Sequence, residues 1–457
     1  MEHINRLITI LDEVESEAYL VGGSVRDYIL QRELDDIDIA VDKRAAEIAR
    51  RFADSLGGSF VVLDEVHDIY RVVNGGLSYD FSLLQGDSIE ADLRRRDFTI
   101  NALAIKLSDF DLADRAATLA GIIDPTGGRD DLEWREIRAV RDDIFREDGL
   151  RLLRAVRFKA ELDFTIAPRT EELLSRDADR LSEIAGERIH DELVKILAAA
   201  DAARNLEYLE EELSLLSPLI PLIEELKEVG QCRYHREDAW THSLATVEQL
   251  EELLADCFWG NLIATDRVPL LKFAALLHDI GKPLTEEVSD GEVHFYGHPQ
   301  AGTDYMKPIL RELCFSKREQ KYIRGLIRYH MRPLLLYNAE NLTSKGKYRF
   351  FQAVGEDLPD VCLLSAADTA STRLLNGRRE EIPGYLAFLK ELIADYRLME
   401  ERTVELLLTG ADLMEIFSLP EGPRIGKLLD RIKEVQARGE IGSKQEAVEY
   451  VKQLLEQ

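Results

Sequence analysis

The spacing of apolar positions changes near residue 130 of the 457-residue chain. Before that point, β-like apolar runs at 37–41 and 61–63 alternate with stretches of helical spacing, and glycine pairs such as 22–23 separate them as turns. Beyond it, apolar residues recur three or four positions apart, as in 150–156, which is typical of helices. The pattern predicts a small α/β domain followed by an almost wholly helical body.

Segments 125–130, 217–221 and 376–384 are candidate domain breaks. No stretch approaches the roughly 20 apolar residues of a membrane helix, and the acidic N-terminus lacks the basic start and apolar block of a signal peptide. We therefore expect a cytoplasmic protein that does not associate with membranes. Four cysteines without a CxxC pair argue against a zinc ribbon or a disulfide framework.

The net charge of the chain limits how it could bind a nucleic acid. Lys and Arg total 58 and Asp and Glu total 87, so the formal net charge is −29. A chain this acidic is not a general nucleic-acid binder, and RNA binding would need local basic segments. Two exist, the arginine run 94–96 and a cluster within 146–159, whereas 207–228 is rich in Glu.

A glycine turn precedes two aspartates. In AYLVGGSVRDYIL (18–30), an apolar strand runs into Gly22-Gly23 and a helix is expected to follow. Glycines there let backbone amides approach a phosphate, and the helix N-terminus adds a favourable dipole. In DDIDIAV, Asp36 and Asp38 fall on one face of a strand. Such a pair is repulsive unless a cation lies between the carboxylates, and Mg²⁺ suits them; the alternative is an ordinary strand end with surface acids.

A third acid, Asp80, alternates with apolar neighbours in LSYDFSLL and could complete a metal site from an adjacent strand. It could equally be a charge at a strand edge. Two ions about 4 Å apart would activate a 3′-hydroxyl and stabilise a leaving pyrophosphate.

Residues 92–104, DLRRRDFTINALA, change this interpretation. Together with GGSVRD and DID, in that order, they resemble the bacterial tRNA nucleotidyltransferase and poly(A) polymerase family, the class II CCA-adding enzymes. The likeness continues through EDGLRLLRAVRF (147–158) and ERIHDEL (187–193). It implies a polymerase beta-like α/β domain with a mixed sheet, Mg²⁺ held by the aspartate pair, and tRNA, CTP and ATP as partners.

The resemblance also implies a role for each motif. Arg95, Arg96 and Asp97 would contact the incoming nucleotide, and Asp148 with Arg151 would read its base edge. Two alternatives stay open: Asp97 as the N-cap of a helix over FTINALAI, and the arginines of the second basic cluster as a solvated stripe. The expected nucleotide-binding residues are Gly22, Gly23, Arg26, Asp27, Arg95, Arg96, Asp97, Asn101, Glu147, Asp148, Arg151, Arg154 and Arg157, beside the catalytic Asp36, Asp38 and Asp80.

A second set of residues resembles the HD metal-dependent phosphohydrolase domain. Imidazole and carboxylate groups from successive helices can ligate a divalent transition metal, and the Asp of the His-Asp pair can bridge two ions. Its substrate would be a phosphoester, such as a 2′,3′-cyclic phosphate at a damaged RNA end. The alternative is a domain that only shapes the tRNA-binding body. The expected ligands are His242, His278, Asp279, His298, His330 and Asp368.

Two further features bear on the substrate. Segment 408–442 resembles the C-terminal segment of CCA-adding enzymes rather than that of poly(A) polymerases, and its Gly-Pro-Arg-Ile-Gly stretch would open a helix suited to a phosphate, or form a plain turn. Only sixteen residues separate Asp80 from Asp97, where full CCA-adding enzymes carry a longer flexible loop that helps the pocket switch from CTP to ATP. An enzyme that adds only CC or only A is therefore a candidate.

We thus expect a tRNA 3′-terminal nucleotidyltransferase that adds C and/or A and releases pyrophosphate. Its rivals are a poly(A) polymerase, an HD phosphohydrolase with a nucleotide-binding N-terminal domain, and a nucleotide sensor. The oligomeric state stays open. Four domains are expected: 1–130 for catalysis, 131–225 for nucleotide recognition and RNA binding, 226–375 for HD metal binding, and 376–457 for tRNA binding.

Overall fold

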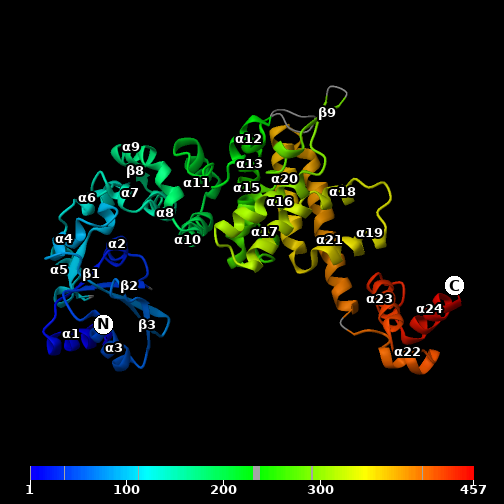
Figure 1. The fold of residues 1–457 in the computed structure, drawn as a ribbon, viewed down its shortest axis with the longest axis horizontal. Coiled ribbons are helices and arrows are strands. Elements are labelled where there is room, and N and C mark those ends of the chain that lie inside the picture. The colour runs from blue at the N-terminus through cyan, green and yellow to red at the C-terminus, as the bar shows by residue number, and fades with distance from the viewer. Residues whose placement is uncertain are drawn as a thin grey trace. The chain divides into compact units, whose positions relative to one another are not determined.

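The computed structural model describes residues 2–34, 36–111, 113–229, 237–289, 292–403 and 405–456. The chain folds as two compact units, which are Met1–Ile196 with Glu211–Leu215 (unit 1) and Leu197–Glu210 with Leu216–Gln457 (unit 2). Unit 1 contains the α/β domain and unit 2 is mostly helical, so the predicted fold class is confirmed (Figure 1). The finer division into four domains stays a prediction.

Unit 1 is built on a six-stranded sheet with the strand order β3-β4-β5-β2-β1-β6. Its strands are β1 (Ala18–Val21), β2 (Asp36–Val41), β3 (Ser59–Asp64), β4 (Ile69–Asn74), β5 (Leu77–Leu83) and β6 (Ala104–Lys106). The β2–β5 pair is parallel and the other neighbours are antiparallel, which makes the sheet mixed, as expected. The two β-like runs of the sequence lie in β2 and β3.

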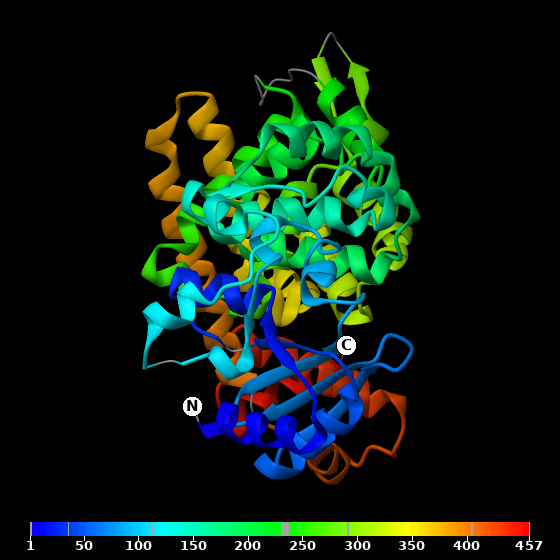
Figure 2. The same ribbon diagram turned by 90° about the vertical axis from the view of Figure 1, so that its left-hand side faces the viewer.

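The alternation along β5 decides which face of this sheet is buried. Tyr79 and Phe81 pack edge-on against Phe52 of α3 (Ala45–Leu56), with ring centroids 5.1 and 5.7 Å apart. Helix α1 (Glu2–Val14) packs beside α3 on the same side of the sheet (Figures 1 and 2). Its His3 Nδ1 lies 2.7 Å from the Tyr79 hydroxyl. Asp80, between the two rings in sequence, points to the opposite face. One face is therefore core, and the other is free for chemistry.

The rest of unit 1 contains one departure from expectation. FTINALAI, expected as a helix capped by Asp97, forms a short 3₁₀ turn (Thr99–Asn101) followed by β6. Its apolar residues are wholly buried, and Ala104 and Ile105 pair with β1. Periodicity alone cannot separate such a buried strand from a buried helix. The helices are α2 (Gly23–Leu30), α4 (Ile89–Leu93), α5 (Arg115–Ala120), α6 (Gly128–Trp134), α7 (Ile144–Glu147), α8 (Leu150–Leu162), α9 (Pro168–Arg176) and α10 (Gly186–Ala198), with a small parallel pair β7 (Glu136–Ile137) and β8 (Thr165–Ile166).

The helices of unit 2 are α11 (Ala202–Glu207), α12 (Leu222–Glu228), α13 (Ala239–Leu254), α14 (Cys257–Gly260), α15 (Val268–Leu277), α16 (His298–Glu312), α17 (Lys317–Tyr329), α18 (Arg332–Tyr337), α19 (Ser344–Val354), α20 (Leu358–Leu375), α21 (Ile382–Thr403), α22 (Gly410–Phe417), α23 (Pro423–Ala437) and α24 (Lys444–Glu456). Of these, α13, α17 and α20 pack against α15, whose sequence VPLLKFAALL is apolar except for Lys272 and is buried from 269 to 277. An antiparallel pair of short strands, β9 (Glu287–Ser289) and β10 (Glu292–His294), was not expected. None of the described helices is long and apolar enough to cross a membrane.

Candidate active site and metal centre

Three aspartates lie together on the free face of the sheet in unit 1. Asp36 and Asp38 share that face of β2, and the strand register pairs Asp38 with Asp80 of β5. Ser24, in the first turn of α2, accepts a hydrogen bond from the Asp38 amide at 2.7 Å and donates one to the Asp36 carbonyl at 3.2 Å. The sequence-predicted acids are thus brought side by side, and α2 holds the strand that carries two of them.

This row of acids is electrostatically strained without a cation. Burial raises the pKa of Asp38 to about 6; Arg96 opposes the rise, and Asp80 and Asp36 add to it. An acid whose ionised form is disfavoured in this way gains from a divalent ion among the oxygens. The donor set, carboxylate oxygens only, is the set that hard cations such as Mg²⁺ prefer.

The glycine turn controls what can approach the acids. Gly22 has a φ of +65°, in the left-handed region that favours glycine. A Cβ at this position would lie 2.7 Å from Arg96 Nη1 and 3.5 Å from Asp38 Oδ2. A residue without a side chain is therefore needed for Arg96 to lie beside the acid row.

Arg71 was not among the expected site residues, yet it contacts the third acid directly. On β4, opposite Asp80 in the register, its Nε and Nη2 donate to the two carboxylate oxygens, each at 2.7 Å. The signal was present in IYRVVN, where a cation alternates with the buried Tyr70 and Val72 and so shares the face of the acids. The sequence alone does not show that β4 pairs with β5, and this pairing is what places Arg71 opposite Asp80.

The predicted ribose- and phosphate-contacting residues form a mostly buried network. Arg26 is 8% exposed and donates to Asn101 Oδ1 at 2.8 Å and to Asp27 at 2.8 and 3.0 Å. Asp97, 6% exposed, accepts from Arg154 at 2.5 and 2.8 Å and from Asn101 at 3.2 Å. Burial would raise the pKa of Asp97, but the Arg154 guanidinium and these hydrogen bonds outweigh it and leave that pKa below its ordinary value. In this structure, Arg26 and Asp97 are bound to the protein rather than directed into open space.

A cavity of about 1020 Å³ lies beside this network and is lined by Arg95, Arg96, Glu147, Asp148 and Arg151 among others. Asp148 accepts from Arg188 Nη2 at 2.7 Å, while Arg151 Nη1 lies 3.2 Å from Glu147. The two expected base-reading groups thus have separate partners within the protein. Arg188, which lies in ERIHDEL, is a cavity residue that was not singled out.

The three arginines of α8 in the second basic cluster do not form a solvated stripe, whereas Arg146 of the same cluster is exposed. Arg151, Arg154 and Arg157 are only 18%, 32% and 12% exposed in their side chains. Each pairs with a carboxylate: Glu147, Asp97 and Glu192 respectively. That alternative is wrong because α8 packs inside unit 1 and its arginines neutralise acids there.

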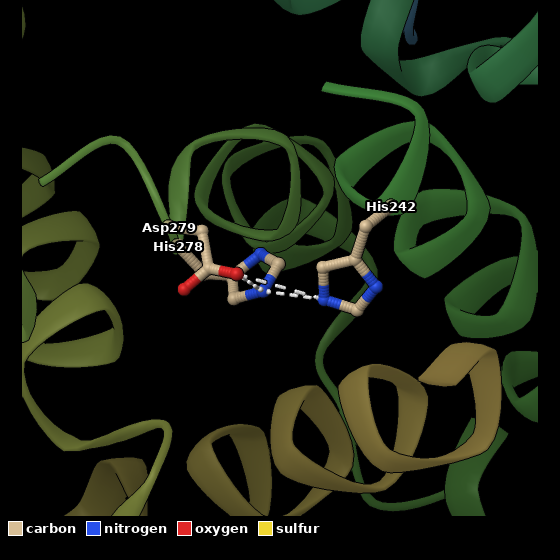
Figure 3. A group of neighbouring side chains, drawn as sticks. All are labelled: His242, His278 and Asp279. Atoms are coloured by element: carbon tan, nitrogen blue, oxygen red, sulfur yellow. Dashed lines mark hydrogen bonds and ion pairs between the residues drawn. The ribbon is translucent and has the colours of Figure 1, made fainter. Parts of the chain in front are cut away.

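In unit 2, the six expected HD residues converge from α13, α16, α20 and the ends of α15 and α17. Asp279 has one oxygen 3.2 Å from His278 Nε2 and 3.6 Å from His242 Nε2. Its other oxygen is 3.1 Å from His298 Nε2 and 3.8 Å from His330 Nε2. Figure 3 shows His242, His278 and Asp279 pointing toward one another. Asp279 therefore faces two imidazole pairs, as a carboxylate that bridges two ions would.

Backbone carbonyls orient three of these rings. The Nδ1 atoms of His278, His298 and His330 lie 2.7 to 2.8 Å from the carbonyl oxygens three residues earlier. An Nδ1–H that donates there leaves the Nε2 lone pair free, which is the usual support for a metal-binding histidine. Burial lowers the pKa of His330 to about 3, so its ring is neutral, as a ligand must be.

The remaining members complete the centre. His242 Nε2 lies 3.2 Å from Asp368 Oδ1, and three overlapping His/Asp groups could each hold a metal ion. Lys282 Nζ lies 2.5 Å from Asp279 and is 5% exposed. Lys282 was not among the expected residues, although it stands in the same HDIGK segment.

Comparison with known proteins places this architecture in a family. The model described as "Poly A polymerase head domain" matches residues 18–86 and 76–138, "Probable RNA and SrmB-binding site of polymerase A" matches 163–227, and "HD domain" matches 239–372. The chain is similar along nearly its whole length to the A-adding tRNA nucleotidyltransferase of Deinococcus radiodurans, with 34% identity over 449 residues, 96% of each chain. The chain belongs to the tRNA nucleotidyltransferase family.

The chain aligns with some members of the family along nearly its whole length and with others over less than half of it. The CC-adding tRNA nucleotidyltransferase of Thermus thermophilus is 35% identical over 94% of this chain and 92% of its own. A CCA-adding enzyme of Lactobacillus delbrueckii is 35% identical over 42% of this chain and 49% of its own. Among solved structures, the Thermotoga maritima CCA-adding enzyme complexed with tRNA has a TM-score of 0.63 at 24% identity and covers 99% of this chain and 94% of its own, which shows a shared fold.

Proposed function

We propose that this chain extends the 3′ end of tRNA with C and/or A residues taken from CTP and ATP. The observation that carries the proposal is the row of Asp36, Asp38 and Asp80 on the free face of the sheet, beside the Gly22 turn. The full-length relatives named as tRNA nucleotidyltransferases support it. In the reaction, the oxygen of the tRNA 3′-hydroxyl bonds to the α-phosphorus, the bond to the β-phosphate oxygen breaks, and pyrophosphate leaves with the bridging oxygen.

The proposed roles follow from the geometry. Asp36 and Asp38 would hold Mg²⁺, which when bound offsets charge on the phosphates and lowers the pKa of the attacking hydroxyl. Asp80 is proposed to shape this site rather than to hold the ion alone, because Arg71 occupies both of its oxygens. The free backbone amides that begin α2 suit a phosphate.

The nucleotide is proposed to lie in the 1020 Å³ cavity. Asp148 can accept from the exocyclic amine that cytosine and adenine share, and Arg151 can donate to ring nitrogen and carbonyl acceptors. Arg95 and Arg96 line the same cavity and suit the triphosphate. The buried and half-buried residues of the hydrogen-bonded network are proposed to keep this cavity in shape: Arg26, Asp27, Asp97, Asn101, Arg154 and Arg157.

We further propose that the chain completes only part of the CCA sequence, either CC or the terminal A. Residues 84–88 alone connect β5 to α4, and this connection is held in place: the Gln85 amide donates to Asp92 at 2.9 Å and Ser88 caps α4. Because this connection is short and held by hydrogen bonds, it provides no flexible loop that could reshape the pocket when the nucleotide changes from CTP to ATP. The full-length relatives of Deinococcus and Thermus, named A-adding and CC-adding, support a divided activity.

The decisive experiment supplies three tRNAs, ending before CC, after one C and after CC, each with CTP or ATP alone. A CC-adding enzyme extends the first two with CTP only, and an A-adding enzyme extends the third with ATP only. Extension of the first two tRNAs with CTP and of the third with ATP by the same protein would refute the divided activity and leave tRNA as the substrate. Long tails of A on unrelated RNA would instead identify a poly(A) polymerase.

A second activity is proposed for unit 2, hydrolysis of a phosphoester at a divalent-metal centre. The convergence of four imidazole Nε2 atoms and two carboxylates favours it, because such a set is typical of transition-metal ligands. Purified protein should contain metal and cleave 2′,3′-cyclic phosphate, and the His278→Ala variant should do neither. Metal-free wild-type protein without this activity would refute the proposal. Finally, we propose a cytoplasmic location, which cell fractionation would test.

A further inference from the structure

A second pocket, of about 320 Å³, opens on the surface of unit 2 between the start of α16, the junction of α17 and α18, and α19. Three of its lining residues are arginines, Arg328, Arg332 and Arg349, and all three are exposed. The lining contains neither Asp nor Glu. In a chain with 87 acidic and 58 basic residues, a pocket with this composition is unusual.

The arginines of the nucleotide cavity provide the contrast. There, Arg96 pairs with Asp92 at 3.1 Å and Arg188 with Asp148 at 2.7 Å. Within the described parts of the chain, the three arginines of the α16–α19 pocket make no ion pair with an acid. Their positive charge is therefore uncompensated, which is the electrostatic condition for binding an anion.

The helices set the spacing of these charges. Arg328 stands in the last turn of α17 and Arg332 at the start of α18, with His330 and Met331 between them in helical conformation. Arg328 and Arg332 therefore flank the two-residue junction between α17 and α18. His330, within this junction, is wholly buried and its Nε2 lies 3.8 Å from Asp279 of the HD centre, whereas the two arginines are exposed. None of the six HD residues lines the pocket, although Gly297 and Pro299 in its lining flank His298.

We infer that Arg328, Arg332 and Arg349 bind consecutive phosphates of the tRNA backbone. Planar guanidinium groups match phosphate oxygens in a bidentate manner. Two cations at the α17–α18 junction and a third from α19 suit a ligand with several linked charges better than a single free phosphate. An acidic protein can hold RNA only at such local basic sites. This inference rests on the proposed function, in which tRNA is the substrate.

The test compares two triple variants that lose the same charge. One changes the pocket, Arg328→Gln, Arg332→Gln and Arg349→Gln. The control changes three exposed cations of α16 and α17 outside it, Lys307→Gln, Lys317→Gln and Arg318→Gln. Fluorescence anisotropy measures tRNA affinity between 50 and 200 mM salt, and circular dichroism checks that both variants are folded.

We expect the pocket variant to bind tRNA at least about tenfold more weakly at low salt, and its plot of log affinity against log salt to be flatter by about two to three. The control should bind within about threefold of the wild type, and the KM for the nucleotide should not change in either variant. Equal tRNA affinity of the two variants would overturn the inference, while tRNA extension by the wild type would leave the proposed function standing. Lost affinity for inorganic pyrophosphate with unchanged tRNA affinity would also overturn it, in favour of a small-anion pocket. A wild type that neither binds nor extends tRNA would refute both.

Discussion

The two candidate sites arrange metal-binding groups in opposite ways. In unit 1, acids stand on the open face of a sheet, with Asp36 exposed and Asp80 bound to Arg71. In unit 2, His242, His278 and His330 are wholly buried, and the Nδ1 atoms of the last two lie against backbone carbonyls. The first site offers hard oxygen ligands, and the second mixes imidazole with carboxylate.

This difference indicates how each site would acquire its ion. Mg²⁺ keeps several waters and is usually bound by one or two carboxylates together with substrate phosphates, so the open acid row suits an ion that arrives with the nucleotide. Buried imidazoles with fixed orientation suit a transition metal that stays in the folded protein. One chain would thus carry an exchangeable ion and a resident one, and the first two predictions below separate the two.

The largest effect is expected from Asp38→Asn. The amide keeps the shape of the side chain but removes the charge that holds the ion, so nucleotide incorporation should fall by about a thousandfold or more. Hydrolysis at the HD centre should not change. Labelled CTP or ATP incorporation measures the first activity and cyclic-phosphate cleavage the second. The exposed Asp109→Asn is the matched control, and addition that survives Asp38→Asn would contradict the assignment.

The second-largest effect is expected from removal of metal, because the two sites should respond to it differently. After dialysis against a strong chelator, Mg²⁺ alone should restore nucleotide addition but not phosphoester hydrolysis. A resident ion present at 100 to 1,000 times its Kd stabilises the folded state by about 3–4 kcal/mol, so the chelated protein should unfold at a lower temperature. His278→Ala should show the same loss without chelator. Elemental analysis of wild type and variant decides the matter, and equal metal content in both would rule out this centre.

Both sites could be predicted largely from local sequence, for two different reasons. The alternation in DIDIAV is enough to put Asp36 and Asp38 on one face, and the HD residues follow a motif. Arg71 and Arg188 were missed because their roles depend on a strand register and on a contact between α10 and the α7–α8 connection, which spacing along the chain does not contain. FTINALAI was assigned to a helix because a buried strand and a buried helix share the same apolar composition.

A smaller effect is expected within unit 1 from Arg151→Ala. Because Arg151 is proposed to read the base and not to hold the ion, the variant should retain addition but lose selectivity. The ratio of CTP to UTP incorporation, measured as kcat/KM, should fall by about 10- to 100-fold, the worth of one good base contact. Arg146→Ala is the control, since Arg146 lines the same cavity but pairs with Asp177 at 3.0 Å. Equal selectivity in wild type and Arg151→Ala would remove Arg151 from base reading.

The smallest effect concerns the stability of the metal-free acid row. Burial raises the pKa of Asp38 from 3.8 to about 6, so ionisation of Asp38 destabilises the folded state as the pH rises through that range. Asp38→Asn avoids this penalty. With chelator present at pH 8, the variant should therefore unfold about 2–4 °C above the wild type, and at pH 4 the two should coincide. Scanning calorimetry at both pH values measures this, and Mg²⁺ with nucleotide should reverse the order at pH 8. A wild type more stable than Asp38→Asn without metal would mean that the acids are balanced by Arg71 and Arg96, and that the row does not depend on an ion.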